Sequence, residues 1–264
     1  MDGRNLVAWT GSFAALYDAE HRALTADIDL YLDLLHEARV RGPVLELACG
    51  SGRVAAPLAA AGHRVVGLDS SPEMLRRARA RRRRLPPEAA SRLRFSRQDM
   101  RRFRFRAPFA AAIVPFSSLA LLAEPEDRAA CLACTAQHLR PRAPLIIDLP
   151  NPLPAMAGAR PRAVASRFRL PRWGHEVEKV VEEVFDPARA TTRVRYRYRQ
   201  LRPGADAPAE LAEACFELAR IERRQIEAQL YAAGFDVVAA LGDYRGTPHS
   251  PTSPRLVIHA ERLE

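Results

Sequence analysis

Val44-Leu-Glu-Leu-Ala-Cys-Gly-Ser-Gly-Arg53 is the stretch that decides the fold, and Val65-Val-Gly-Leu-Asp69 follows it after one helix length. The first stretch predicts a buried strand and a glycine-rich turn that opens a helix, and the second predicts a neighbouring strand that ends in an acid. Glycines let the backbone approach a ligand closely, and an acid at that strand end can accept hydrogen bonds from ribose hydroxyls. The pattern therefore indicates an α/β fold that binds an adenosine-containing ligand.

One charge in this motif distinguishes two classes of adenosine ligand. Glu46 lies before the glycines, where a carboxylate repels the pyrophosphate of NAD or FAD. S-adenosylmethionine has no phosphate and carries a sulfonium and an ammonium, so an acid attracts it. The segment 50–55 also fits the dinucleotide pattern G-x-G-x-x-A, and Asp69 has a spacing close to the expected one. We favour S-adenosylmethionine, and a nicotinamide oxidoreductase stays open as the alternative.

Further motifs lie around this turn and towards both ends of the chain. They are Glu46-x-Ala48-x-Gly50-x-Gly52, Asp69, Gln98-Asp99-Met100, Leu16-Tyr17-Asp18, Pro115-Phe116-Ser117-Ser118 and Ala233-Gly234-Phe235. With these motifs the chain resembles the class I S-adenosylmethionine-dependent methyltransferases of small-molecule type, including glycine/sarcosine and deoxysugar N-methyltransferases. The resemblance spans nearly the whole chain and is specific for fold and cofactor. The family often has glycine in place of Ala48, but alanine also lets the backbone pass close to a ligand.

The order of the predicted elements is that of a Rossmann-like, doubly wound sheet of seven strands. Alternation of strands and helices demands parallel strands and right-handed crossovers. We expect the first five strands at 43–48, 64–68, 92–96, 109–114 and 144–149. One or two helices are expected at 12–38, and single helices at 53–61, 126–139 and 222–233. A further helix should start near Pro72 with Ser70 or Ser71 as its cap. Strands at 235–241 and 255–262 should close the sheet as a hairpin, which makes the last strand antiparallel.

The chain divides into four predicted parts. They are an N-terminal helical lid at 1–40, the cofactor-binding core at 41–150, an antiparallel β insertion at 151–222, and a C-terminal helix and strands at 223–264. The insertion is inferred from the strand-rich segment 177–185 and from 193–199, where Val, Tyr and Tyr alternate strictly with four arginines. Such an insertion can cover the substrate, and its tyrosine face can also serve as a homodimer contact.

The composition limits the class of protein. The 264 residues carry a formal charge of +10, and the segment 76–106 holds fourteen arginines against two acids. Only one lysine occurs in the whole chain, whereas phosphate-binding surfaces use lysine freely, so we interpret the arginines as a solvated helix end. No signal peptide is evident after Met1, and the longest uncharged run, 107–123, is interrupted by proline and serines. We therefore expect a soluble, cytoplasmic protein without a membrane or nucleic-acid partner.

Several signatures of other chemistries are absent from the sequence. The four cysteines form no disulfide framework, and Cys131-x-x-Cys134 has no second pair, so we expect no metal site. No Asn-Pro-Pro-Tyr-like tetrapeptide and no Pro-Cys pair follow the fourth strand, which argues against amide or adenine-amine methylation and against cytosine C5 chemistry. Asp148 alone keeps a catechol-type magnesium site open.

Cofactor contacts are expected mainly from the first two strands. Glu46, Ala48, Gly50 and Gly52 should surround the methionine part and the adjoining ribose, and Asp69 should accept from the ribose hydroxyls. The resemblance implies that Asp99 receives the adenine amino group. The remaining expected cofactor contacts are Tyr17, Ser70, Met74, Met100 and Pro115.

The methyl acceptor should lie at the carboxyl ends of the strands. Candidate substrate residues are Ser117, Ser118, Trp173, His175 and Arg245. Helix capping by either serine is an equal alternative for that pair. Candidate catalytic residues are His249, whose imidazole titrates near neutrality, and Tyr17 on the lid. We interpret His21 and His138 as incidental.

The sequence thus predicts a methyltransferase that moves a methyl group from S-adenosylmethionine to a nitrogen, or next an oxygen, of a small metabolite by in-line displacement. The second product is S-adenosylhomocysteine. Two other hypotheses stay open. One is an RNA methyltransferase that uses the arginine-rich segment 76–106, and the other is a non-catalytic S-adenosylmethionine-binding subunit.

Overall fold

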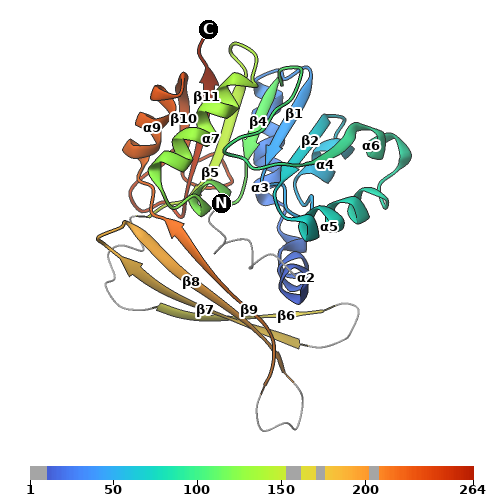
Figure 1. The fold of residues 1–264 in the computed structure, drawn as a ribbon, viewed down its shortest axis with the longest axis vertical. Helices are drawn as coiled ribbons and strands as arrows, with labels where there is room; N and C mark the ends of the chain where they lie inside the picture. The colour runs from blue at the N-terminus through green and yellow to red at the C-terminus, as the bar shows by residue number, and fades with distance from the viewer. Residues whose placement is uncertain (1–10, 153–161, 171–175, 202–207) are drawn as a thin grey trace.

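The computed structural model describes residues 11–152, 162–170, 176–201 and 208–264. Two β-sheets organise these residues, a large sheet flanked by helices and a smaller sheet packed below it (Figure 1). No helix in these ranges is long and apolar enough to cross a lipid bilayer. Trp173 and His175 lie outside the described residues.

The large sheet has seven strands in the order β10-β11-β5-β4-β1-β2-β3. Their bounds are β1 (Pro43–Leu47), β2 (Arg64–Asp69), β3 (Leu93–Arg97), β4 (Ala111–Val114), β5 (Pro144–Pro150), β10 (Phe235–Leu241) and β11 (Arg255–Arg262). The first five strands pair in parallel, whereas β11 is antiparallel to both β5 and β10. This confirms the predicted Rossmann-like sheet with an antiparallel last strand.

Helices cover both faces of this sheet. On one face α7 (Pro125–Gln137) and α9 (Arg223–Ala232) pack against alternate residues of β5, β4 and β11. On the other face lie α3 (Ala26–Glu37) and α4 (Ala55–Ala60). Every residue of β4 is buried, as expected for a central strand covered on both faces. Further helices are α5 (Pro72–Arg82) and α6 (Pro87–Arg92), and Ser71 caps α5 by accepting from the Met74 amide at 3.2 Å.

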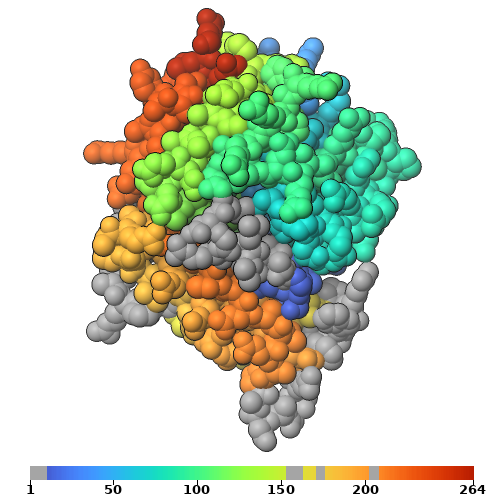
Figure 2. All heavy atoms as spheres, in the orientation of Figure 1, coloured from blue at the N-terminus to red at the C-terminus, as the bar shows by residue number. Residues whose placement is uncertain are grey.

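The second sheet is the predicted antiparallel insertion. Its order is β6-β7-β8-β9, with bounds β6 (Arg162–Arg169), β7 (Glu176–Asp186), β8 (Thr191–Leu201) and β9 (Ala209–Ala219). Helix α2 (Gly11–Glu20) packs on one face of this sheet, where the Phe13 ring lies 5.6 Å from the rings of both Tyr198 and Phe216. In Figure 2 the orange residues of this sheet and the blue residues of α2 lie together below the α/β part. The tyrosine face is thus buried within the chain, so it gives no support to the predicted homodimer.

The structure adds elements that the sequence did not indicate. Strand β9 is rich in alanine, glutamate and leucine, which favour helix, and pairing along its whole length with β8 overrides that preference. Neither β6 nor α6 was predicted. The N-terminal region, expected to form one or two helices, contains two, separated by the short 3-10 turn η2 (His21–Ala23).

Candidate functional site

A cavity of about 940 Å³, open solvent included, lies at the carboxyl ends of β1, β2 and β4. Ligands of open α/β sheets bind at this edge. Its lining residues are Tyr17, Asp18, His21, Glu46, Ala48, Cys49, Gly50, Ser51, Arg53, Val54, Leu68, Asp69, Ser70, Met74, Met100, Pro115, Phe116, Ser118 and Leu121. The lining therefore includes most of the residues predicted to contact the cofactor, together with others that the sequence did not single out.

The turn after β1 folds through left-handed backbone conformations. Ala48, Gly50 and Gly52 have φ of 52°, 53° and 74°. A side chain at Gly50 would meet no atom within 4 Å, so space beside its backbone is open to a ligand. At Gly52 a Cβ would lie 3.1 Å from the Phe95 ring, so this glycine serves packing and is not part of the cavity lining. An alanine in the left-handed region costs about 1–2 kcal/mol, which makes Ala48 a strained position and not merely a mild replacement for glycine.

Asp69 holds this turn in place. One of its carboxylate oxygens accepts the Gly50 amide at 2.8 Å, and the other accepts the Ser71 amide at 2.8 Å. Burial raises the pKa of Asp69, and the backbone donors oppose that rise. A carboxylate has about four lone-pair sites, so it can still accept from ligand hydroxyls. The geometry is compatible with the predicted ribose contact.

Glu46 is a buried carboxyl with an unsatisfied oxygen. Its relative exposure is 1%, and Oε2 has no hydrogen-bond partner among the described residues. Burial raises the pKa of Glu46 to about 8, with a further rise from Asp69 and an opposing effect of Arg53. A cationic ligand group would satisfy this oxygen and favour its charged form, whereas a pyrophosphate would do the opposite. The residues present thus fit the ammonium end of S-adenosylmethionine.

Asp99 is engaged elsewhere. Its carboxylate accepts from the Arg101 amide at 2.9 Å and from the Arg101 guanidinium at 2.7 Å, and Arg101 also pairs with Asp127 at 2.9 Å. Asp99 is not among the described residues that line the cavity, whereas its neighbour Met100 is. The adenine contact of Asp99 stays a prediction.

The remaining wall of the cavity comes from α2, η2 and the segment after β4. The rings of Tyr17 and His21 lie 4.1 Å apart, and the His21 ring meets Phe116 edge-on at 5.1 Å. Burial raises the pKa of Tyr17, so its hydroxyl stays protonated and can donate but does not act as a base. From the sequence we interpreted His21 as incidental, and its position in the cavity wall was not predicted. The available signal was its spacing of four residues after Tyr17, which places both side chains on one helix face.

The segment after β4 owes its shape to β5. Phe116 and Ser117 have φ of 49° and 65°, consecutive left-handed values outside glycine. The Phe116 amide donates to Asp148 Oδ2 at 3.2 Å, and the Ser117 amide donates to the Asp148 backbone carbonyl at 2.8 Å. Ser117 Oγ accepts from Arg255 at 3.3 Å, and Ser118 Oγ donates to the Pro115 carbonyl at 2.7 Å. Both predicted substrate serines therefore make structural hydrogen bonds, although Ser118 also lines the cavity.

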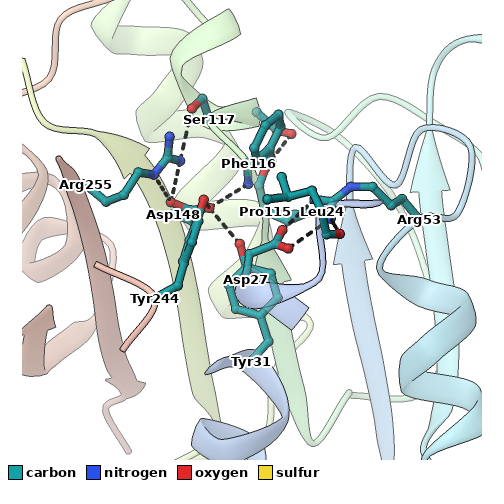
Figure 3. A network of polar contacts seen from close by, with 11 residues as sticks. Leu24, Asp27, Tyr31, Arg53, Pro115, Phe116, Ser117, Asp148, Tyr244 and Arg255 are labelled. Carbon is teal, nitrogen blue, oxygen red and sulfur yellow. Dashed lines mark hydrogen bonds and ion pairs between the residues drawn. The ribbon is translucent and has the colours of Figure 1, made fainter. Parts of the chain in front are cut away.

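Asp148 is the centre of a polar network (Figure 3). It is fully buried and accepts from the hydroxyls of Tyr31 at 2.7 Å and Tyr244 at 2.9 Å and from Arg255 Nε at 2.9 Å. Together with the Phe116 amide these donors occupy both carboxylate oxygens. Both oxygens of Asp148 already accept hydrogen bonds from the protein, so the structure gives no support to the hypothesis that Asp148 binds magnesium.

A second guanidinium completes the wall. Arg53 donates to both carboxylate oxygens of Asp27 and to the Leu24 carbonyl, and it lies 5.1 Å from the centre of the Phe116 ring. Arg255 lies 5.7 Å from the same centre. Phe116 is thus held by two cations, each fixed by its own buried aspartate.

The other predicted acceptor-site residues lie apart from this cavity. The charges of Arg223 and Glu227 on α9 act on His249, and its Nε2 has no hydrogen-bond partner within the described ranges. Arg245 is exposed in the turn after β10, where its amide donates to Asp243 at 2.8 Å. Neither belongs to the described cavity lining, so a catalytic role of His249 stays a prediction that this geometry does not support.

Comparisons with known proteins agree with this geometry. Residues 44–142 match the family described as "Methyltransferase domain". The fold is similar to that of an S-adenosylmethionine-dependent methyltransferase from Clostridium acetobutylicum ATCC 824, with a TM-score of 0.78 at 17% identity over 96% of this chain and 98% of that chain. It is also similar to S-adenosylmethionine-bound CalS10, an amino pentose methyltransferase from Micromonospora echinaspora, with a TM-score of 0.72 at 21% identity over 96% and 98%. The sugar N-methyltransferase KedS8 from Streptoalloteichus sp ATCC 53650 gives a TM-score of 0.73 at 19% identity over 96% and 93%.

A curated relative matches a short segment only. An uncharacterized RNA methyltransferase from Parasynechococcus marenigrum (strain WH8102) is 44% identical over 46 residues. The matched segment covers 17% of this chain and 10% of that relative.

The family match and the topology identify residues 44–142 as a methyltransferase domain on a Rossmann-like sheet. The domain is therefore that of a methyltransferase. The unsatisfied carboxyl of Glu46 in its cavity fits S-adenosylmethionine better than a dinucleotide.

Replacing Asp148 with asparagine should lower the free energy of unfolding by about 3–5 kcal/mol, because the Arg255 guanidinium would lose its buried counter-charge. Tyr244→Phe, which removes one donor and no charge, should cost only about 1.5 kcal/mol. Urea unfolding followed by circular dichroism measures both. Equal losses in the two variants would contradict the central role of the Asp148 charge.

Binding of S-adenosylhomocysteine, which keeps the cofactor's ammonium, should release a proton from Glu46 below the pKa of about 8 of the free protein. The affinity should therefore rise between pH 6 and 7.5, by up to about tenfold per unit. Calorimetry in buffers of different ionisation enthalpy measures the proton. The control ligand is 5′-methylthioadenosine, which lacks the amino-acid end, and Glu46→Gln should abolish the pH dependence. The same slope for both ligands would refute the contact.

Proposed function

We propose that this protein transfers the methyl group of S-adenosylmethionine to a nitrogen of a small metabolite, and next in preference to an oxygen. The observation that carries the proposal is the composition of the cavity. Its lining combines residues expected to bind the cofactor with an aromatic and aliphatic group, Tyr17, His21, Phe116 and Leu121, which is called the acceptor wall below. Such a mostly apolar cavity suits a small acceptor that enters beside the sulfonium.

The chemistry needs alignment more than activation. The sulfonium makes the methyl group reactive when the cofactor is bound, so the chain has to orient the acceptor in line and exclude water. In the proposal Glu46 holds the ammonium and Asp69 holds the ribose hydroxyls. These two contacts would fix the amino-acid chain and the ribose, which lie on either side of the sulfur. The methyl group would then point towards Tyr17 and His21.

We also propose that the N-terminal helices act as a lid over the cofactor. Asp18 of α2 accepts from Ser51 Oγ of the glycine turn at 2.5 Å and from Arg81 of α5 at 2.5 Å. Opening of α2 would break these bonds together with the packing of Phe13 on the second sheet. The lid would therefore be held closed by contacts to the glycine turn, to α5 and to the second sheet.

The choice of nitrogen rests on similarity. CalS10 is described as an amino pentose methyltransferase and KedS8 as a sugar N-methyltransferase, and both share this fold over nearly the whole chain. These descriptions name sugars, and the aromatic and aliphatic residues in the lining of this cavity support a small acceptor for this chain.

RNA methylation is the second candidate function. The short match to an RNA methyltransferase and the arginines of 76–106 favour it. Several of these arginines, however, bind partners within the chain. Arg81 pairs with Asp18, Arg82 donates to the Ala90 carbonyl at 2.8 Å, and Arg101 pairs with Asp99 and Asp127. Because these arginines make contacts within the chain, fewer of them are available to bind RNA phosphates. This supports the small-molecule proposal.

The test is to incubate the protein with S-adenosylmethionine that carries a deuterated methyl group, in the presence of cleared cell extract and of total RNA. We expect the label in the small-molecule fraction, where mass spectrometry identifies the methylated compound. Asp69→Ala should reduce cofactor affinity by at least about tenfold, because a hydrogen-bonded charged group is removed. The control is Asp236→Ala, at an exposed position on β10.

Three outcomes separate the candidates. Label in RNA, with binding that weakens steeply with salt, would support the second candidate. Stoichiometric cofactor binding without label in either fraction would indicate a non-catalytic subunit. Label in a small amine would establish the proposed function.

A further inference from the structure

His21 is the one group in the acceptor wall whose chemistry the proposed function leaves unused. Among the described residues of the cavity lining it is the only imidazole, and it lies between the Tyr17 and Phe116 rings. A neutral amine that gains a methyl group through its lone pair becomes a charged ammonium, so a proton must leave the nitrogen to give the neutral product. Which group takes up this proton is a question that rests on the proposed function.

The hydrogen bond of His21 fixes its tautomer. Nδ1 lies 2.8 Å from the backbone carbonyl oxygen of Tyr17, near the end of α2. A carbonyl can only accept, so Nδ1 must carry the proton and donate it. In the neutral ring Nε2 is therefore an acceptor with a free lone pair. The same bond satisfies one of the last carbonyls of the helix, which locks the orientation of the ring.

The surroundings keep this ring neutral. Burial lowers the pKa of His21, and the charges of Lys179 on β7 and Arg53 before α4 act in the same direction. Glu20 opposes them, with its carboxylate 3.8 Å from Nδ1, but it is itself paired with Lys179 at 2.9 Å and accepts from Tyr198 at 2.6 Å. A neutral imidazole at physiological pH is the form that can receive a proton.

We propose that Nε2 of His21 accepts a hydrogen bond from the acceptor's amino group and takes its proton during methyl transfer. The nitrogen lone pair forms the new bond to the methyl carbon while the carbon–sulfur bond breaks. Its electron pair stays on sulfur, which becomes the neutral thioether of S-adenosylhomocysteine. The proton passes from the methylated nitrogen to His21 and from there to solvent when the product leaves.

The probe that tests this without a known acceptor is sinefungin, which carries an amine-bearing carbon in place of the sulfur and its methyl group. Its ammonium should therefore occupy the position where methyl and acceptor meet. S-adenosylhomocysteine has the same nucleoside and amino-acid end but lacks this amine. The ratio of the two dissociation constants, measured by calorimetry, isolates the contact, because effects on Glu46 or Asp69 cancel.

His21→Asn keeps a donor for the Tyr17 carbonyl but removes the Nε2 acceptor. We expect it to weaken sinefungin binding about 10- to 100-fold and to leave S-adenosylhomocysteine binding unchanged. His21→Gln, whose amide oxygen can replace Nε2, should recover part of the loss. In the wild type the sinefungin preference should fall at low pH, because a protonated His21 repels the ammonium. The matched control is His63→Asn, at a histidine between α4 and β2 outside the described cavity lining.

Each result has one meaning. An unchanged ratio in His21→Asn, or a ratio that does not vary with pH in the wild type, would overturn the assignment of His21 and leave the proposed function intact. Equal weakening of both ligands would show that His21 only supports the fold. Failure of the wild type to bind S-adenosylhomocysteine would instead overturn the proposed function.

Discussion

The buried carboxylate of Asp148 is the contact on which the arrangement of this site depends. It accepts hydrogen bonds from a helix that precedes the sheet, from the segment after β4 and from the C-terminal hairpin, through Tyr31, Phe116 and Arg255. A fully buried charge is tolerated only where donors surround it, so these three parts of the chain must meet at one point. The left-handed backbone at Phe116 is a consequence of that demand. The position of the Phe116 ring, and so the shape of the acceptor wall, follows from a residue that does not itself line the cavity.

The electrostatics of the cavity favour the proposed sulfonium nucleoside over a dinucleotide. The fold is shared with dinucleotide-binding proteins, and the glycine turn alone does not separate the two ligand classes. Here Glu46 is desolvated and only partly hydrogen-bonded, so its carboxyl is poised to become charged when a cation arrives. Arg53 lies close enough to influence Glu46 but is already neutralised by Asp27. The site therefore offers a net attraction for the ammonium and none for a pyrophosphate.

Sequence reasoning succeeded where the chemistry is local and failed where it depends on distant partners. The glycine turn, Asp69 and the strand alternation are encoded within short windows, and the structure reproduces them. His21 was dismissed because its role depends on Phe116, which is 95 positions away in the sequence. His249 looked suitable because it follows a strand near the expected face, but the described cavity lining does not include it. Strand β9 was missed because its composition favours a helix, and only the neighbouring β8 makes it a strand.

The sequence by itself determined the fold class, and it predicted the cofactor and most of the residues expected to contact it. These follow from hydrophobic period, from backbone conformations that favour glycine, and from one acid placed before the turn, all of which act over a few neighbouring residues. Only the tertiary structure decided which side chains form the aromatic wall of the cavity. That wall is assembled from α2, from the segment after β4 and from the donors that hold Asp148. The physical reason is that packing and burial of charge bring together residues whose separation along the chain carries no local signal.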